Sequence, residues 1–201
     1  MVYAAPDAAR RLDVFGRDVP MPRVFEWNWL ASQQLDTWMS DIDGVVCYDP
    51  PVFDDDGPGY EAALRDAVPL YLPRRPLRSL ITCRLARWRS ITEDWLARHG
   101  VVAGELILHP APTADARRQQ GRYGEWKGEH YRNSGCTLFI ESSAVQSPAI
   151  ARVARKPVLC LEDKRIYLAS FDLFLSVSTL APSVDIRRAR PQRGYPPSGD
   201  G

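Results

Sequence analysis

The chain has 201 residues, enough for one well-buried domain or for one domain with an arm. It carries 26 Lys and Arg against 25 Asp and Glu, and this balance excludes the strong positive field typical of nucleic-acid-binding proteins. The N-terminal sequence lacks the apolar core of a signal peptide. The most apolar late segment, residues 166–181, is interrupted by Asp172 and is shorter than the roughly 20 apolar residues of a spanning helix. We therefore expect a cytoplasmic protein without a nucleic-acid or membrane partner.

The cysteines and histidines give no metal-binding or disulfide pattern. The four cysteines are dispersed, with no Cys-x-x-Cys pair, and three lie in or beside apolar runs, where a cysteine acts as a small hydrophobic residue. The histidines do not pair with them at the spacing of zinc ligands. This predicts a reducing compartment and argues against a disulfide framework or a zinc site. These residues are Cys47, Cys83, Cys136, Cys160, His99, His109 and His130.

Short apolar runs alternate with helical patterns over most of the chain. In chain order, the patterns predict a strand at 37–43, a helix at 60–68, a strand at 78–84, a helix at 90–101, a strand at 105–110, a helix at 124–135, a strand at 137–143, a helix at 144–155 and a strand at 156–163. The helix at 90–101 has an N-cap candidate in Ser90, with Glu93 as its capping-box partner, and Gly100 ends it. Residues after about Arg165 form one more strand or helix.

This alternation predicts an α/β fold: a three-layer sandwich with a parallel, Rossmann-like sheet of five or more strands. The segment from Arg84 to Trp126 is accounted for by one helix, one strand and a connection, so we expect little or no cap domain and a fairly open site. We divide the chain into an N-terminal aromatic-rich arm (1–35), the α/β domain (36–180) and a disordered tail (181–201).

Two segments at the ends have alternative interpretations. The tail holds a basic cluster, which we interpret as solvated, at Arg187, Arg188, Arg190 and Arg193. The aromatic segment 23–30 is interpreted as packing its tryptophans onto the sheet or a helix. In the alternative, the segment is an interaction surface, since clustered tryptophans suit interface anchors.

Polar residues follow the predicted strands at the edge where ligands bind in parallel sheets. Asp41 and Asp43 close the first strand, Thr82 the second, and Glu141 and Ser142 the fourth. Taken singly, each has a plain interpretation: an Asx turn for the acid pair and Gly44, a strand end for Thr82, a solvated position for Lys127 on its helix. Glu141 is harder to explain in that way, because an unpaired carboxylate at the end of an apolar strand is costly.

Taken together, these residues suit phosphoryl transfer. A phosphoryl group carries spread negative charge that cations must offset before an anionic nucleophile approaches. Mg²⁺ takes oxygen ligands and retains several waters, and Asp41, the backbone carbonyl of Asp43 and Glu141 supply such ligands. Lys127 adds a second positive charge, and Thr82 with nearby backbone N–H groups holds a phosphate oxygen.

Four segments carry a resemblance to a known superfamily. "DIDGVV", "SLITCR", Lys127 in "GEWKGEHY" and "LFIESS" resemble the four motifs of the haloacid-dehalogenase superfamily of phosphatases and phosphotransferases. The resemblance covers about residues 38–163. The fourth motif has Glu141-Ser142 where many relatives carry paired aspartates, so one carboxylate is retained.

A closer resemblance adds a partner. "PRVFEWNW" before "DIDGVVCYDP", then "FIESS" with Gln146 and "KPVLCLED", is similar to the C-terminal half of two-domain proteins whose N-terminal half is phosphoribosyltransferase-like. That half is essentially missing here, and the chain has no acidic-pair-plus-threonine loop for phosphoribosyl pyrophosphate. The transferase activity is therefore not expected.

The resemblance implies a mechanism. Asp41 attacks phosphorus and forms an aspartyl-phosphate, and Asp43 protonates the leaving alcohol and then deprotonates the attacking water. The anionic neighbour of Asp43 is expected to raise its pKa. Lys127 and Mg²⁺ hold Asp41 ionised, Thr82 orients the transferring group, and Glu141, assisted by Ser142, fixes the metal directly or through water.

The expected substrate is a small phosphorylated metabolite, with a nucleotide or a phosphosugar favoured. The candidates for binding the substrate are Thr82, Arg84, Lys127 and Ser142. Arg84, together with Arg87, is a candidate for binding a second anionic group. The acids Asp54, Asp55 and Asp56 are interpreted as a solvated loop, with a gate at the entrance of the site as the alternative. Two alternatives remain open. One is a binding or regulatory module with weak or no catalysis that works with a phosphoribosyltransferase-like partner protein, and the other is a different phosphoryl or carbon–oxygen chemistry on the same fold.

Overall fold

The computed structural model of the chain describes residues 3–4, 17–18, 29–51 and 56–168. The predicted tail, most of the aromatic segment 23–30 and the acids Asp54 and Asp55 lie outside the described residues. Trp29 belongs to the described part: it is 1% exposed in the core, and its ring meets that of Tyr71 edge-on. This tryptophan packs inward, as the sequence predicts for the segment.

A six-stranded sheet forms the centre of the fold, in the order β5-β4-β3-β6-β7-β8. All neighbouring pairs are parallel except β7 and β8, which are antiparallel. The strands are β3 (Trp38–Asp41), β4 (Leu77–Leu85), β5 (Ala103–His109), β6 (Leu138–Glu141), β7 (Val158–Cys160) and β8 (Arg165–Tyr167). A separate parallel pair consists of β1 (Tyr3–Ala4) and β2 (Arg17–Asp18).

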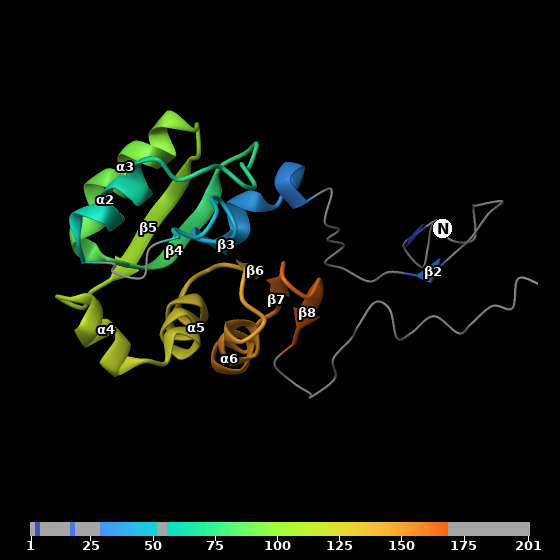
Figure 1. The fold of residues 1–201 in the computed structure, drawn as a ribbon. Coiled ribbons are helices and arrows are strands. Elements are labelled where there is room, and N and C mark those ends of the chain that lie inside the picture. Colours follow the sequence, from blue (N-terminus) through green and yellow to red (C-terminus); the bar gives the residue numbers. More distant parts are fainter. Residues whose placement is uncertain (1–2, 5–16, 19–28, 52–55, 169–201) are drawn as a thin grey trace, which may run out of the picture.

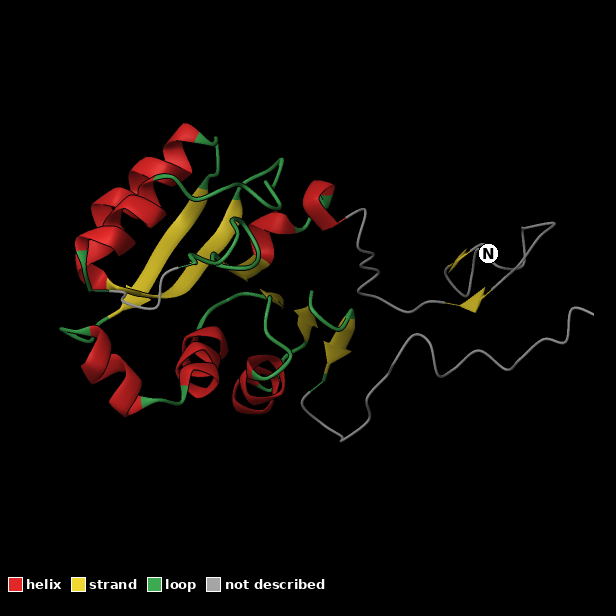
Figure 2. Ribbon diagram, viewed as in Figure 1, coloured by secondary structure: helices red, strands yellow, loops and turns green. Residues whose placement is uncertain are grey.

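Helices lie on both faces of the sheet (Figures 1 and 2). On one face lie α2 (Pro58–Arg65) and α3 (Arg89–Arg98); on the other lie α5 (Tyr123–Asn133) and α6 (Gln146–Ala154), with α4 (Ala114–Gln120) between β5 and α5. The described residues thus form an α/β fold with a six-stranded, mostly parallel sheet and five helices, compatible with a Rossmann-like three-layer arrangement. Among them, no helix has the length and apolar character needed to cross a membrane.

Neighbouring residues of each central strand bury their side chains on opposite faces of the sheet. Trp38, Leu80 and Ile140 belong to the core on the α3 side, which also holds Trp95 of that helix. The residues beside them, including Met39, belong to the core on the α5 and α6 side. Both faces are therefore covered, which explains why these strands read as continuous apolar runs rather than as an alternating pattern.

Two local predictions are wrong. The helix α4 was expected to be part of a connection, although Thr113 caps it by accepting from the Ala116 N–H and Gly121 follows its last residue. Ser90 is not an N-cap: α3 begins at Arg89, directly after a 3₁₀ turn at 86–88. Because the turn runs into the helix, the backbone N–H of Arg89 donates to the carbonyl oxygen of Ala86 in the turn.

The connectivity reverses direction at β3. From β3 the chain adds β4 and β5 on one side, and then returns to place β6 on the other side of β3. Such a switch point opens a crevice beyond the carboxyl ends of the strands, where ligands bind in sheets of this kind. Asp41 ends β3 and Glu141 ends β6, so the two acids stand at that crevice.

Close contact between α5 and α6 depends on two glycines of α5. A Cβ atom at Gly128 would lie 2.8 Å from Cβ of Val153 and 3.1 Å from the carbonyl oxygen of Ile150, and one at Gly124 would lie 2.8 Å from Cβ of Ala149. Only glycine permits this approach, which sets the position of α5 and hence of Lys127.

We predict that Gly128→Ala lowers the free energy of unfolding by about 2 kcal/mol, because the added methyl group forces the two helices apart. Urea denaturation measures this change. Gly59→Ala in α2 is the matched control, since a Cβ there meets nothing within 4 Å and the substitution should leave the stability unchanged or slightly higher. Equal stability of Gly128→Ala and the parent would contradict the close packing.

Candidate active site

The site is built on the ends of the three central strands. Asp41 is the last residue of β3, Glu141 is the last residue of β6, and Thr82 lies in β4 where the register with β5 shifts. Asp43 follows in a turn that includes Gly44, whose φ is 73°. Lys127 reaches the same place from α5. The structure therefore brings together the predicted constellation from four separate segments.

A buried ammonium group joins two of the carboxylates. Nζ of Lys127 donates to Oδ2 of Asp41 at 2.7 Å and to Oε2 of Glu141 at 2.8 Å. All three residues are at most 4% exposed. A buried ion group of this kind is costly to leave incomplete, because removal of one partner strands an uncompensated charge. The three side chains are therefore held in one arrangement.

Glu141 is fully occupied by protein donors. Its Oε1 accepts from the backbone N–H groups of Ser142 and Ser143 at 3.0 and 3.1 Å, with the Ser142 hydroxyl oxygen 3.3 Å away, while Oε2 accepts from Lys127. The sequence predicted a metal ligand at this position. The contacts instead favour a role in orienting Lys127 and the turn after β6.

Arg84 pairs with Asp43 instead of facing open solvent. Its Nη2 lies 2.6 Å from Oδ1 of Asp43, and its Nε lies 3.1 Å from both carboxylate oxygens. The remaining donors of this buried guanidinium contact Thr92 and Cys47. Arg84 was predicted to bind a second anionic group of the substrate, but its charge is already directed at the Asp43 carboxylate.

The protonation of Asp43 differs from the sequence-based expectation. Burial alone would raise its pKa, but the charge and hydrogen bonds of Arg84, with a further hydrogen bond from the Thr82 hydroxyl at 3.1 Å, outweigh burial and lower the pKa. The neighbouring acid was expected to raise it. The neighbour's effect is smaller because Arg84 contacts Asp43 directly. In this arrangement Asp43 is ionised at neutral pH.

Asp41 shows the opposite tendency. Burial is the main cause that raises its pKa, and the charges of Glu141 and Asp43 add to it, while Lys127 acts in the other direction. The pKa of Lys127 is raised despite burial, because Asp41 and Glu141 flank its ammonium group. Three carboxylates thus share two buried cations, Lys127 and Arg84, which leaves the site with an excess of one negative charge when all are ionised.

Ser142 links the turn after β6 to the turn after β3. Its hydroxyl donates to the backbone carbonyl of Asp43 at 3.1 Å. A Cβ atom at Gly44 would lie 2.5 Å from Cβ of Ser142, so the two turns meet without room for any side chain at residue 44. Ser142 was predicted to bind substrate. The structure places it at the cavity wall with its hydroxyl turned to the neighbouring turn.

The site offers oxygen donors of the kind that Mg²⁺ prefers, but too few of them for a complete metal site. The carboxylate of Asp41 and the carbonyl of Asp43 are hard oxygen donors, and Mg²⁺ commonly uses one or two such groups together with waters. Within the described residues, however, no group of three or more His, Cys, Asp or Glu side chains is arranged to hold a metal ion. Asp41 and the Asp43 carbonyl are therefore the residues that would hold Mg²⁺, with the Ser142 hydroxyl beside them.

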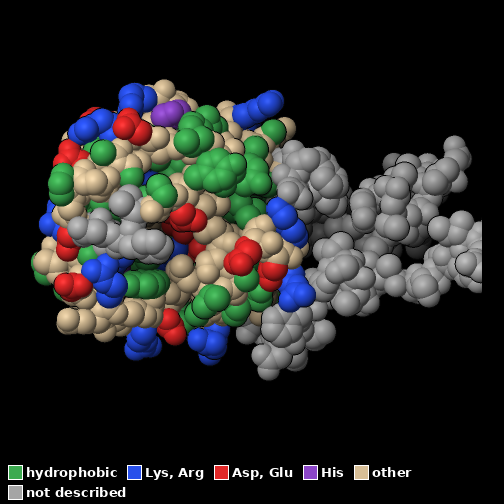
Figure 3. All heavy atoms as spheres, viewed as in Figure 1, with side chains coloured by type: hydrophobic (Ala, Val, Ile, Leu, Met, Phe, Trp, Pro, Cys, Tyr) green, Lys and Arg blue, Asp and Glu red, His purple; other side chains and the backbone are tan. Residues whose placement is uncertain are grey.

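A cavity of about 420 Å³ opens above these residues. On the face shown in Figure 3, some acidic side chains lie near the middle, and basic and other acidic side chains lie around the edge. Sequence reasoning did not assign a site role to several of the lining residues: Asp49, Tyr60, Arg117, Arg118 and Tyr123. The pKa of Asp49 is raised by burial and by the charges of Asp43 and Glu141. Thr113 before α4 and Gly121 after it are the sequence signals for a helix that would have placed Arg117 and Arg118 at this cavity.

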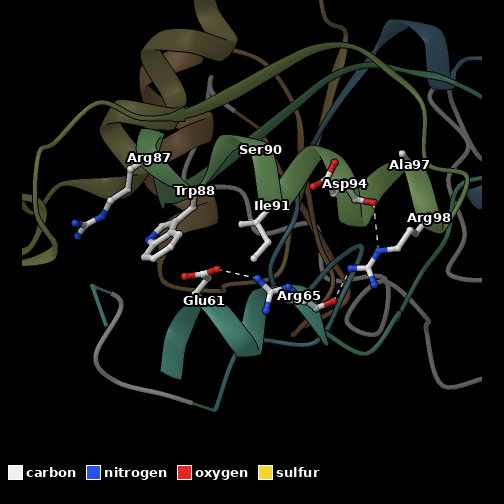
Figure 4. Close-up of a pocket in the computed structure, with 9 residues that line it drawn as sticks. All are labelled: Glu61, Arg65, Arg87, Trp88, Ser90, Ile91, Asp94, Ala97 and Arg98. Atoms are coloured by element: carbon white, nitrogen blue, oxygen red, sulfur yellow. Dashed lines mark hydrogen bonds and ion pairs between the residues drawn. The ribbon is translucent and has the colours of Figure 1, made fainter. Parts of the chain in front are cut away.

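A second cavity lies between α2 and α3, away from the strand ends (Figure 4). Three of its charged side chains are engaged with each other or with the backbone: Arg65 pairs with Glu61, and Arg98 donates to the carbonyl oxygens of Asp94 and Arg65. This cavity is larger, about 750 Å³, but it gathers no comparable buried acids and bases. We therefore take the cavity at the strand ends as the candidate active site.

Comparison with protein-family models, with curated proteins and with solved structures found no match to this chain.

The Asp43–Arg84 pair makes a testable contribution to stability. We predict that Arg84→Met lowers the free energy of unfolding at pH 7 by about 3 kcal/mol, because it leaves a largely buried carboxylate without its cation. The pKa of Asp43 in the folded state lies below its reference value of 3.8, so the pair stabilises the fold above that pH. The loss should therefore shrink as the pH falls below about 4.

Chemical denaturation at a series of pH values measures this effect. Arg65→Met is the control: its pair with Glu61 has side chains that are 54% and 44% exposed, and such pairs contribute little. An Arg84→Met variant as stable as Arg65→Met at pH 7 would show that the buried pair does not stabilise the protein.

Proposed function

We propose that this protein is a magnesium-dependent phosphatase that hydrolyses a small phosphate ester through an aspartyl-phosphate at Asp41. The observation that supports this proposal most strongly is the buried contact of Lys127 with both Asp41 and Glu141 beneath a cavity at the switch point of the sheet. An acid fixed by a cation at the cavity floor has the surroundings that a carboxylate nucleophile requires. The motif resemblance to haloacid-dehalogenase-like phosphatases agrees with this role, and we infer a fold of that type.

The roles follow from the contacts. A carboxylate oxygen of Asp41 bonds to phosphorus as the ester P–O bond breaks, and the leaving oxygen departs with the electron pair and takes a proton from solvent, because Asp43 is ionised. Lys127 offsets the charge that gathers on Asp41 and the phosphoryl group. Asp43, held ionised by Arg84, takes a proton from the water that then hydrolyses the aspartyl-phosphate. Mg²⁺, when bound at Asp41 and the Asp43 carbonyl, supplies further positive charge to the phosphoryl oxygens.

Several roles change from the sequence-based interpretation. Asp43, held ionised by Arg84, no longer serves as the acid that protonates the leaving alcohol. Thr82 is fully buried and its hydroxyl donates to Asp43, so we assign it to positioning that carboxylate. Glu141 positions Lys127. All four cysteines are free, as a reducing compartment favours, and we propose that the protein acts in the cytoplasm.

A second candidate function is a binding or regulatory module with weak catalysis, working with a phosphoribosyltransferase-like partner protein. The observation that favours it is the saturation of the acids by protein donors. Asp41 accepts from the Ile42 N–H and from Lys127, and Asp43 is held by Arg84. Such a network is stable without a ligand, so the site binds a metal ion weakly in this interpretation.

We predict that Asp41→Asn removes Mg²⁺-dependent phosphate release from a panel of phosphate esters by at least about a thousandfold, because an amide is not a nucleophile for phosphorus. Its circular dichroism spectrum should match that of the parent. The matched control is Asp94→Asn, an exposed acid on α3, which should retain full activity. Phosphate release by Asp41→Asn at the parent's rate would show that the nucleophile is another group.

We also predict that Ser142→Asp tightens Mg²⁺ binding by about tenfold, because a carboxylate beside the Asp43 carbonyl adds charge and a hard ligand. Isothermal titration calorimetry of both proteins measures this difference. Unchanged or weaker Mg²⁺ binding would place the metal site away from this turn.

A further inference from the structure

The leaving oxygen of the proposed reaction requires a proton that Asp43 does not supply. An alcohol leaves phosphorus slowly as an alkoxide, and faster when an acid protonates its oxygen as the P–O bond breaks. Despite burial, the pKa of Asp43 is lowered by Arg84, whose Nη2 lies 2.6 Å from the carboxylate, so Asp43 is ionised at neutral pH. A side chain that borders both solvent and the cavity can pass on a proton from water in step with bond breaking.

Asp49 has this position. It lines the active-site cavity together with Asp41 and Lys127. The residue as a whole is exposed, so its carboxyl group exchanges protons with water. Its Oδ2 would lie only 3.2 Å from a Cβ atom at Gly44, so the carboxyl group also reaches the turn that follows Asp43. Asp49 therefore connects solvent with the side of the cavity at which the first acidic segment ends.

The charges around Asp49 favour its protonated form. Partial desolvation at the cavity wall raises its pKa, and the negative charges of Asp43 and Glu141 raise it further. Lys127 and Arg84 act in the other direction, but each of these cations is in direct contact with a carboxylate other than Asp49. Asp43 and Asp49 therefore differ in protonation because Arg84 touches only the first of them.

The remaining groups of the cavity do not reverse this tendency. The other walls carry two arginines of α4, of which Arg117 donates to the carbonyl oxygen of Cys83 and Arg118 pairs with Asp115. Beneath the cavity, three carboxylates and two cations leave one excess negative charge. Mg²⁺ and a phosphate dianion carry equal and opposite charges, so this excess persists when both are bound and continues to favour a proton on Asp49.

We propose that Asp49 is the general acid of the reaction and passes a proton from solvent to the leaving alcohol oxygen. This inference deepens the proposed function and rests on it, because it concerns the same cavity. As the P–O bond breaks, the ester oxygen keeps the bonding electron pair and takes the proton of the Asp49 carboxyl group, and the resulting carboxylate regains a proton from water. Two acids in different surroundings thus divide the work, with Asp43 as the base and Asp49 as the acid.

Hydrolysis of two esters of similar shape by the full chain tests this inference. 4-Nitrophenyl phosphate releases a weakly basic phenolate that needs little protonation, whereas 4-nitrobenzyl phosphate releases a strongly basic alkoxide. With Mg²⁺ present, Asp49→Asn should lower kcat/KM for 4-nitrobenzyl phosphate about a hundredfold and for 4-nitrophenyl phosphate by only about threefold. The ratio kcat/KM is the suitable measure, because it covers the steps up to departure of the leaving group and not the later hydrolysis of the aspartyl-phosphate.

Two companion variants separate acid catalysis from a structural effect. Asp49→Glu keeps a carboxyl group and should recover part of the activity on 4-nitrobenzyl phosphate. Asp94→Asn makes the same change at an exposed acid of α3 outside this cavity and should alter neither rate. An equal loss of both activities in Asp49→Asn, or full activity of that variant on 4-nitrobenzyl phosphate, would overturn the inference.

The result is distinguishable from failure of the proposed function. Loss of both ester activities in Asp41→Asn, together with an equal effect of Asp49→Asn on the two esters, would support the phosphatase proposal and reject Asp49 as its acid. A parent protein that hydrolyses neither ester would contradict the phosphatase proposal itself, and the role of Asp49 would fall with it.

Discussion

The ammonium group of Lys127, buried between Asp41 and Glu141, is the interaction on which the site depends. A lysine that is 1% exposed cannot stay charged without carboxylate partners, and those carboxylates cannot stay charged without it. The three charges come from β3, α5 and β6, so correct folding of the sheet and of the α5–α6 pair is needed before any of them is satisfied. This mutual dependence links the stability of the core to the geometry of the cavity floor.

A second buried ion pair, between Arg84 and Asp43, lies beside the Lys127 group. Arg84 fixes Asp43 and keeps it ionised, so the two acids of "DIDG" have opposite surroundings although one residue separates them. Like charges placed this close are tolerated because each has its own buried cation. The cost is that little of the acids' hydrogen-bonding capacity is left for a metal ion, which explains why the described residues show hard oxygen donors but no complete metal-binding group.

The sequence predicted these strands well because β3, β4, β6 and β7 each contain a run of apolar residues, which is typical of strands buried on both faces. The sequence also predicted that Asp41 and Glu141 lie close together, since neighbouring parallel strands end at the same edge of the sheet. It did not predict which oppositely charged side chains would pair. The contact of Arg84 with Asp43 spans 41 positions and depends on the strand register, which no local pattern encodes. The helix α4 was missed because it is short and polar, and Arg117 and Arg118, which it places in the cavity lining, were missed with it.

The central claim is that Asp41 carries the phosphoryl group during turnover. The most direct measurement is to quench the protein in acid during hydrolysis of a phosphate ester with Mg²⁺ present, reduce the acyl phosphate with borohydride, and locate the modified residue by peptide mass spectrometry. The account predicts reduction of the carboxyl group at residue 41, absent when substrate is omitted. Steady phosphate release with no modification at residue 41, or modification at another residue, would contradict it.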